Sequence, residues 1–248
     1  MEIMNVDEFV ETLGKGVSVL CSSDHGFGTD AILLANFSGI KSKDIACDMG
    51  TGCGIIPLLW LRDGAKNDIY GVDIQERAID QFTKSIELSG FPSNVHPVLH
   101  DLREIEKVLS KGSFNLVTMN PPYKEAGTGI LSETTADKIA RHETMCTIND
   151  VVKAGATLLN FGGRFCMCHR PERLCDVICA MREYGLEPKR IRFVQKRPDT
   201  APWLFLIEGK KGAKPHINVM PPLIIQDENS NNSKELNEII GEYAERNP

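Results

Sequence analysis

Three glycines at alternate positions follow a short apolar segment, and this feature restricts the fold more than any other in the sequence. Residues 43–48 are predicted to form a strand, and Gly50, Gly52 and Gly54 lead from it into a helix over residues 55–61. Glycine adopts left-handed backbone conformations at little cost, so the chain can turn sharply here and approach a ligand closely. A strand, a glycine loop and a helix in this order are typical of an α/β domain that binds a ligand at the end of its first core strand.

Short apolar runs alternate with amphipathic segments along the rest of the chain. The runs predicted as strands are residues 43–48, 68–73, 94–100, 113–120 and 163–169. The segments predicted as helices are residues 75–89, 147–160 and 171–184. Strands that alternate with helices indicate a doubly wound, mostly parallel sheet with helices on both faces. Two late runs, residues 190–195 and 202–208, have no helix between them and are expected to pair antiparallel near one sheet edge.

The chain of 248 residues is expected to fall into three parts. Residues 1–40 form an N-terminal segment with a hairpin near residues 17–21 and a helix over 29–37, packed on the main domain. Residues 41–225 form the α/β domain itself. Residues 226–248 form a polar linker and a short terminal helix.

The composition excludes several classes of protein. No apolar run approaches the roughly 20 residues that span a bilayer, and the first residues do not form a secretory signal. Eight cysteines are present without any C-x-x-C pair, and their spacing matches no zinc pattern well. The sequence therefore predicts a cytoplasmic protein with reduced cysteines, no metal and no membrane partner.

Three acidic residues each follow a predicted strand. They are Asp48, Asp73 and Asp101. The spacing D-x-G-x-G-x-G differs from the dinucleotide fingerprint G-x-G-x-x-G, whose helix N-terminus faces a pyrophosphate. S-adenosyl-L-methionine carries no phosphate and suits this loop better. A single acid at a strand end is a helix N-cap about as often as a ligand, and a nucleotide-binding domain of another kind is the alternative for the whole set.

Each acid has an expected partner on that cofactor. Asp48 is expected to meet its amino group, and Asp73 to accept hydrogen bonds from both ribose hydroxyls, with Ile74 beside it. Asp101 is expected to receive the adenine amino group, with Leu102 next to the ring.

A catalytic site for the group that accepts the transfer is predicted at Asn120, Pro121, Pro122 and Tyr123, after the strand over residues 113–120, and Asn120 is also expected to contact the cofactor. The Asn120 amide oxygen and the Pro121 carbonyl can both accept hydrogens from one planar NH2 group. Two prolines fix their φ angles and stiffen the loop, while Tyr123 offers a ring for stacking. The alternative is that the motif has no role in binding and forms only a proline-rich turn.

These residues together resemble the class I methyltransferase family over about residues 45–208. That resemblance implies a seven-stranded sheet with the last strand antiparallel, and a cofactor across the carboxyl ends of the strands. The Asn-Pro-Pro-Tyr motif resembles that of amino-methyltransferases acting on adenine N6, on guanine N2 of ribosomal RNA, or on glutamine of release factors.

Further motifs narrow the resemblance. These are the sequences H-G-F-G-T-D-A at 25–31, R-H-E at 141–143 and M-P-P-L at 220–223, with Lys124 and Gly127 after the acceptor motif. The combination resembles the bacterial tRNA1(Val) adenine-37 N6-methyltransferase family over nearly the whole chain. It implies that Phe27 and Thr29 flank the cofactor, that the tRNA anticodon loop is the substrate, and that the protein is a monomer or weak dimer. Protein glutamine N5-methylation and guanine N2-methylation of ribosomal RNA are the alternatives; the former enzymes usually carry a larger helical N-terminal domain.

The charge is distributed unevenly along the chain. The net charge is -6, yet residues 160–215 contain 12 lysines and arginines against 6 acids. The basic stretch over residues 164–214 is expected to contact an RNA phosphate backbone, with an ordinary solvated surface as the alternative.

Overall fold

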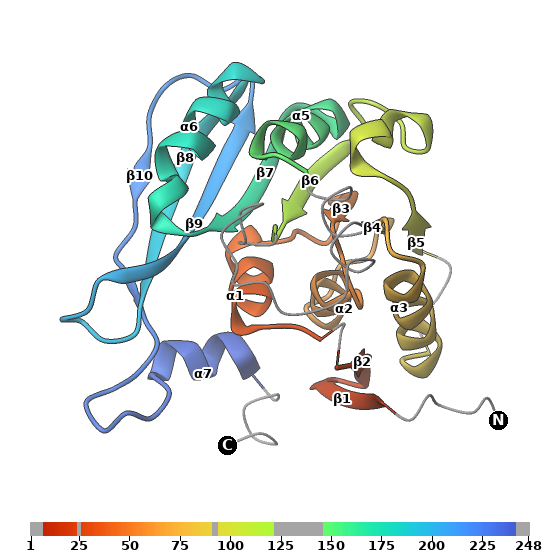
Figure 1. Ribbon diagram of the computed structural model, residues 1–248, viewed down its shortest axis with the longest axis horizontal. Coiled ribbons are helices and arrows are strands. Elements are labelled where there is room, and N and C mark those ends of the chain that lie inside the picture. Colours follow the sequence, from red (N-terminus) through yellow and green to blue (C-terminus); the bar gives the residue numbers. More distant parts are fainter. Residues whose placement is uncertain (1–6, 24–25, 91–93, 122–145, 242–248) are drawn as a thin grey trace, which may run out of the picture.

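A computed structural model of the protein describes residues 7–23, 26–90, 94–121 and 146–241. The described residues form a two-stranded hairpin and one large sheet with helices against it (Figure 1). The Pro122 and Tyr123 of the predicted acceptor site, together with His25, Lys124, Gly127 and residues 141–143, lie outside the described part.

The large sheet has nine strands among the described residues, and its order reverses beside the glycine loop. From one edge to the other the strands are β10 (Asn218–Val219), β8 (Leu186–Gln195), β9 (Pro202–Lys211), β7 (Leu159–His169), β6 (Phe114–Met119), β3 (Ala46–Met49), β4 (Ile69–Asp73) and β5 (Val95–Leu99), while β11 (Leu223–Ile224) also pairs with β8. β9 runs antiparallel to both β7 and β8, and the other pairs are parallel. The predicted fold class is confirmed, including the antiparallel pairing of the two late strands, and β10 and β11 extend the expected seven strands to nine among the described residues.

Helices cover both faces of this sheet, as predicted. They are α1 (Thr29–Ser38), α2 (Ile55–Arg62), α3 (Glu76–Leu88), α5 (Ile148–Leu158), α6 (Leu174–Glu183) and α7 (Lys234–Ile240), with short 3-10 turns at η1 (Leu102–Lys107) and η2 (Pro171–Arg173). Buried side chains of α1, α2, α3 and α7 belong to one apolar cluster, and those of α5, α6 and η1 belong to a second. The sheet therefore separates two cores, which is the layer arrangement of a doubly wound domain.

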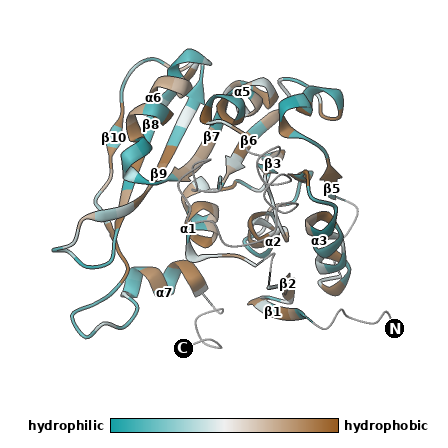
Figure 2. Ribbon diagram, in the orientation of Figure 1, coloured by the Kyte–Doolittle hydropathy of each residue, from teal (hydrophilic) through white to brown (hydrophobic). Residues whose placement is uncertain are grey.

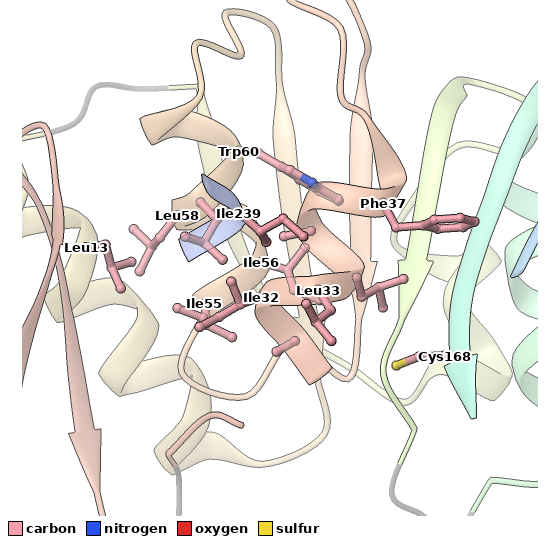
Figure 3. Close-up of a cluster of buried hydrophobic side chains, with 14 of the residues drawn as sticks. Leu13, Ile32, Leu33, Phe37, Ile55, Ile56, Leu58, Trp60, Cys168 and Ile239 are labelled. Carbon is pink, nitrogen blue, oxygen red and sulfur yellow. The ribbon is translucent and has the colours of Figure 1, made fainter. Parts of the chain in front are cut away.

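The first core joins segments from both ends of the chain. Figure 3 shows Leu13 of the hairpin and Ile239 of α7 among side chains of α1 and α2. Trp60 is fully buried there, and its indole N–H donates to the Ser38 hydroxyl at 3.0 Å. Hydrophobic residues also line the central strands, whereas the segment between β11 and α7 is hydrophilic (Figure 2). The N-terminal hairpin and the C-terminal helix thus share the core of the α/β domain.

The hairpin consists of β1 (Glu8–Gly14) and β2 (Val17–Ser22). Serine hydroxyls at the end of α3 accept hydrogen bonds from backbone amides of β2. Ser85 accepts a hydrogen bond from the Leu20 amide at 2.8 Å, and Ser89 accepts one from the Ser18 amide at 3.0 Å. These contacts hold β2 against α3 and the residue that follows it.

The start of β7 and the presence of two short strands differ from the prediction, each for a physical reason. β7 begins at Leu159, before the glycines at 162 and 163, because a bulge separates the pairs Phe114–Leu159 and Leu116–Arg164. A bulge places extra residues in one strand, so β7 extends back past the predicted strand start at residue 163 into the predicted end of the helix over residues 147–160. β10 and β11 were not predicted, since two-residue strands carry no periodic pattern. Among the described residues, no helix is long and apolar enough to cross a membrane.

Candidate active site

The glycine loop has a left-handed backbone at each of its three glycines. The φ angles are 63° at Gly50, 55° at Gly52 and 82° at Gly54, a region that other residues enter at a cost. A Cβ at Gly54 would lie 1.9 Å from the Phe82 ring, so this glycine lets α3 pack under the loop. A Cβ at Gly52 would meet nothing within 4 Å. The loop is thus packed on one side and open at Gly52, where a ligand can approach the backbone.

Asp73 joins this loop to the end of β4. One carboxylate oxygen accepts from the Gly52 amide at 2.9 Å and the other from the Gln75 amide at 3.0 Å. Each oxygen keeps a second lone pair, which is what two vicinal hydroxyls require. Ile74 follows with 40% of its surface exposed and offers an apolar face at the same strand end. The geometry suits the expected ribose contact.

Asp48 is a buried acid at the end of β3. Only 1% of it is exposed, and the Thr118 hydroxyl of β6 donates to its Oδ1 atom at 2.6 Å. Burial raises the pKa of Asp48 to about 7; the charge of Asp73 adds to this rise, and the Thr118 hydroxyl opposes it. A nearby ammonium group would favour the charged carboxylate. The site is therefore matched to a cationic ligand group near neutral pH.

Asp101 has partners within its own turn. Its carboxylate caps η1 by accepting from the Arg103 amide at 2.9 Å and pairs with the Arg103 guanidinium, which lowers its pKa. Leu102 is buried in the second core. Asp101 is therefore an N-cap, which was the alternative to a ligand contact. The expected contacts of Asp101 and Leu102 with adenine stay predictions.

Asn120 and Pro121 directly follow β6. Asn120 is half-buried, and its amide oxygen accepts from the Cys168 thiol of β7 at 3.1 Å. Pro121 is buried. At the start of α1, Thr29 is exposed and Phe27 packs against the first core, with Gly28 as the N-cap.

The topology brings three of the predicted residues to one edge. β4, β3 and β6 are parallel neighbours, so Asp73, Asp48 and Asn120 lie at their shared carboxyl end. The chain leaves β3 in one direction through β4 and β5, then returns to the other side at β6 (Figure 1). A parallel α/β sheet binds its ligands at such a switch point.

Sequence reasoning did not identify Thr118 and Cys168. Thr118 stands opposite Asp48 in the β3–β6 register, and Cys168 follows the pair Met119–Met167 in the β6–β7 register. Their contacts depend on strand register across segments distant in sequence, which no local motif reports.

The structure assigns internal partners to several residues of the basic stretch. Arg164 donates to Asp44 at 2.8 Å, Arg190 to Glu208 at 2.7 Å and Arg192 to Glu235 at 2.8 Å. Lys211 donates to the carbonyls of Ala156 and Leu159, both at 2.7 Å, near the end of α5. These side chains hold elements together, which narrows the expected phosphate contact to the exposed remainder. That remainder includes Lys196 and Arg197 in the β8–β9 connection, where Arg197 lies 3.6 Å from the exposed Asp199.

The opposite edge of the sheet carries a shallow hollow of about 540 Å³, partly lined by Lys111, Lys153, Tyr184 and Lys211. It contains none of the residues expected to bind cofactor or acceptor. Within the described part of the chain, no group of three or more His, Cys, Asp or Glu side chains is placed to hold a metal ion. The carboxyl edge is therefore the candidate active site.

Curated proteins similar to this chain include two bacterial tRNA1(Val) (adenine(37)-N6)-methyltransferases. That of Photobacterium profundum is 25% identical and covers 68% of this chain and 72% of its own length. That of Parabacteroides distasonis is 27% identical, over 73% of this chain and 75% of its own length.

Solved structures share the fold. A predicted O-methyltransferase from Agrobacterium tumefaciens superimposes with a TM-score of 0.69 at 18% identity, over 85% of this chain and 95% of its own. A SAM-dependent methyltransferase from Aquifex aeolicus gives 0.53 at 16% identity, over 73% and 89%. The sequence model of the methyltransferase small domain matches residues 15–172. The chain belongs to this methyltransferase family, whose members use S-adenosylmethionine.

Proposed function

We propose that this methyltransferase transfers a methyl group from S-adenosylmethionine to N6 of an unpaired adenine in a tRNA anticodon loop. The observation that carries the proposal is the Asn-Pro-Pro-Tyr sequence that begins at the carboxyl end of β6, beside the strand that ends in the glycine loop. The names of the curated relatives support the same acceptor.

The residues at this edge fit the cofactor. The open backbone at Gly52 and the free lone pairs of Asp73 suit its ribose, and the buried Asp48 carboxylate suits its ammonium group. When bound, the cofactor supplies an electrophilic methyl group on a sulfonium.

The chain's own residues hold the acceptor. The Asn120 amide oxygen and the Pro121 carbonyl accept the two hydrogens of the NH2 group, which leaves the nitrogen lone pair directed outward. Hydrogen bonds of this kind strengthen as the nitrogen becomes tetrahedral and positively charged, so they stabilise the transition state more than the ground state. The proton leaves the nitrogen after transfer, and no strong base is required.

An anticodon-loop adenine matches this site because it is unpaired. Its extrusion costs less than that of a base in a duplex, and Tyr123 would provide a stacking ring. Lys196 and Arg197 lie at the carboxyl end of β8, on the same edge of the sheet as Asn120. We propose that they contact RNA phosphates on that side of the acceptor.

The experiment that tests the proposal offers the purified protein three acceptors. These are tRNA from cells that lack the modification, ribosomal RNA and a release factor, each with isotope-labelled cofactor. We expect label in N6-methyladenosine from the anticodon loop, and far slower labelling with the Asn120→Ala variant. Label in glutamine or in N2-methylguanosine, without label in tRNA, would replace this acceptor with one of the two alternatives.

Two further proposals concern organisation. Residues 41–225 would form the catalytic unit that residues 1–40 and 226–248 complete by packing. The protein would act as a monomer or weak dimer, which light scattering across a concentration series would check.

A further inference from the structure

Cys168 lies where β7 reaches the acceptor site, and its thiol contacts Asn120. The sulfur lies 3.1 Å from the Asn120 amide oxygen, a short distance for a thiol donor. Met119 of β6 pairs with Met167 of β7, so Asn120 and Cys168 are the next residues along two parallel strands. Cys168 is fully buried, and packing therefore fixes the position of its thiol.

The Asn120 side chain needs such a contact because the two ends of an amide have nearly the same shape. The terminal torsion of asparagine is broad, and a half-turn about it exchanges the oxygen for the NH2 group. An NH2 group in that place would repel the hydrogens of an amino acceptor. A donor on the oxygen favours one of the two orientations.

A thiol is suited to this task by its weakness. The S–H group is a weak donor, and the amide oxygen has two lone pairs. With two lone pairs, the oxygen has the capacity to receive the thiol proton and a second hydrogen bond. The contact therefore orients the amide with little competition for its oxygen.

We infer that Cys168 is a positioning residue for methyl transfer, which holds the Asn120 amide with its oxygen toward the acceptor NH2 group. The inference rests on the proposed function, because that function assigns the acceptor contact to Asn120. A residue that acts in this way affects the rate of transfer and leaves cofactor affinity unchanged, since its partner acts on the acceptor.

The same strand supplies a matched control. Cys166 lies two residues earlier on β7, on the same face of the strand, and is also fully buried in the first core. Its sulfur lies 3.8 Å from the Glu208 carboxylate, so its contact is with β9 and not with the acceptor site. Cys166→Ala and Cys168→Ala remove the same atom from the same core, so both carry a similar packing cost.

The experiment measures single-turnover methyl transfer, cofactor affinity by calorimetry and thermal unfolding for Cys168→Ala, Cys168→Ser and Cys166→Ala. We expect Cys168→Ala to transfer methyl roughly tenfold more slowly than Cys166→Ala, with the same cofactor affinity, as for a small misplacement of a catalytic contact. Cys168→Ser keeps a donor and is expected to recover part of the rate, because a hydroxyl orients the amide but competes more strongly for its oxygen. Equal rates for the two alanine variants, or no recovery with serine, would overturn the inference.

A double variant keeps the test sound if Cys168→Ala is poorly folded. In an Asn120→Ala background, Cys168→Ser should change the rate no further, because the oriented group is gone. A further loss there would show that the thiol acts elsewhere. If tRNA accepts no methyl but glutamine does, the tRNA proposal fails and the same comparison is made with glutamine. If the wild-type protein methylates no amino acceptor, the proposed function and the inference about Cys168 are both wrong.

Discussion

Asp48 combines deep burial with a pKa near neutrality, and this makes the stability of the protein depend on pH. Its pKa rises from 3.8 to about 7 on folding, mainly because burial disfavours the charge. Between these values the folded protein binds more protons than the unfolded chain. The contribution of Asp48 is therefore most favourable below about pH 4 and is lost as pH rises to about 7.

The Asp48→Asn variant tests this account. Asparagine keeps an oxygen for the Thr118 hydroxyl and removes the buried charge. At pH 8 we expect the cofactor-free variant to be more stable than wild type by up to about 4 kcal/mol, from roughly 1.4 kcal/mol per pKa unit. This gain in stability should shrink toward pH 5. The variant should also bind the cofactor more weakly than wild type does. Urea unfolding at both pH values measures the difference, and an equal gain at both would contradict a titrating Asp48.

Asn120 is predicted to act on the rate of chemistry. Asn120→Ala removes one preorganised acceptor from the transition state, so kcat should fall on the order of 100-fold while cofactor binding stays nearly intact. Single-turnover transfer and calorimetry separate the two effects. Transfer at the wild-type rate would mean that the Asn-Pro-Pro-Tyr loop is structural.

At the scale of the element, two glycines of the loop have different roles: Gly54 permits packing against Phe82, and Gly52 leaves room for a ligand. Gly54→Ala would place a methyl group inside the Phe82 ring and strain a φ of 82°, so we expect a large loss of unfolding free energy. Gly52→Ala meets no atom within 4 Å and carries mainly the left-handed strain, about 1–2 kcal/mol. Its methyl group instead occupies the open side of the loop and should weaken cofactor binding. Urea unfolding and calorimetry on both variants would reveal this separation, and equal losses of stability would refute it.

The sequence predicted these elements wherever a local pattern sets them. The glycine spacing, the acids at strand ends and the 3.6-residue periodicity are local, and they located the loop, Asp48, Asp73 and the helices on both faces. The bulge in β7 and the short strands β10 and β11 depend on pairing with distant strands. The same holds for the contacts of Thr118 and Cys168, and for the pairing of Asp101 with Arg103 in place of an open carboxylate.

At the scale of the whole molecule, the basic stretch serves two purposes. Arg164 and Arg190 donate to backbone carbonyls at the end of α1 and reach Glu208, so they join three strands to a helix. Removal of a partner from such a group leaves a buried charge uncompensated, and the loss appears as stability. Lys196 and Arg197 are exposed, so their role can be tested without unfolding the protein.

The last prediction compares two pairs of exposed basic residues in the same stretch. Lys196→Gln with Arg197→Gln removes two charges at the acceptor edge, and Lys210→Gln with Lys214→Gln removes two charges at the opposite edge. If RNA lies across the carboxyl edge, the first pair should weaken tRNA binding and reduce the salt slope by about 1–2, since each phosphate contact releases roughly one counterion. The second pair should leave both nearly unchanged because its charges lie away from Asn120. Filter binding at several salt concentrations measures both quantities, with unfolding curves to show that neither pair alters stability. Equal effects of the two pairs would indicate that net charge alone governs RNA binding, and no effect from either would leave the exposed basic residues as a solvated surface.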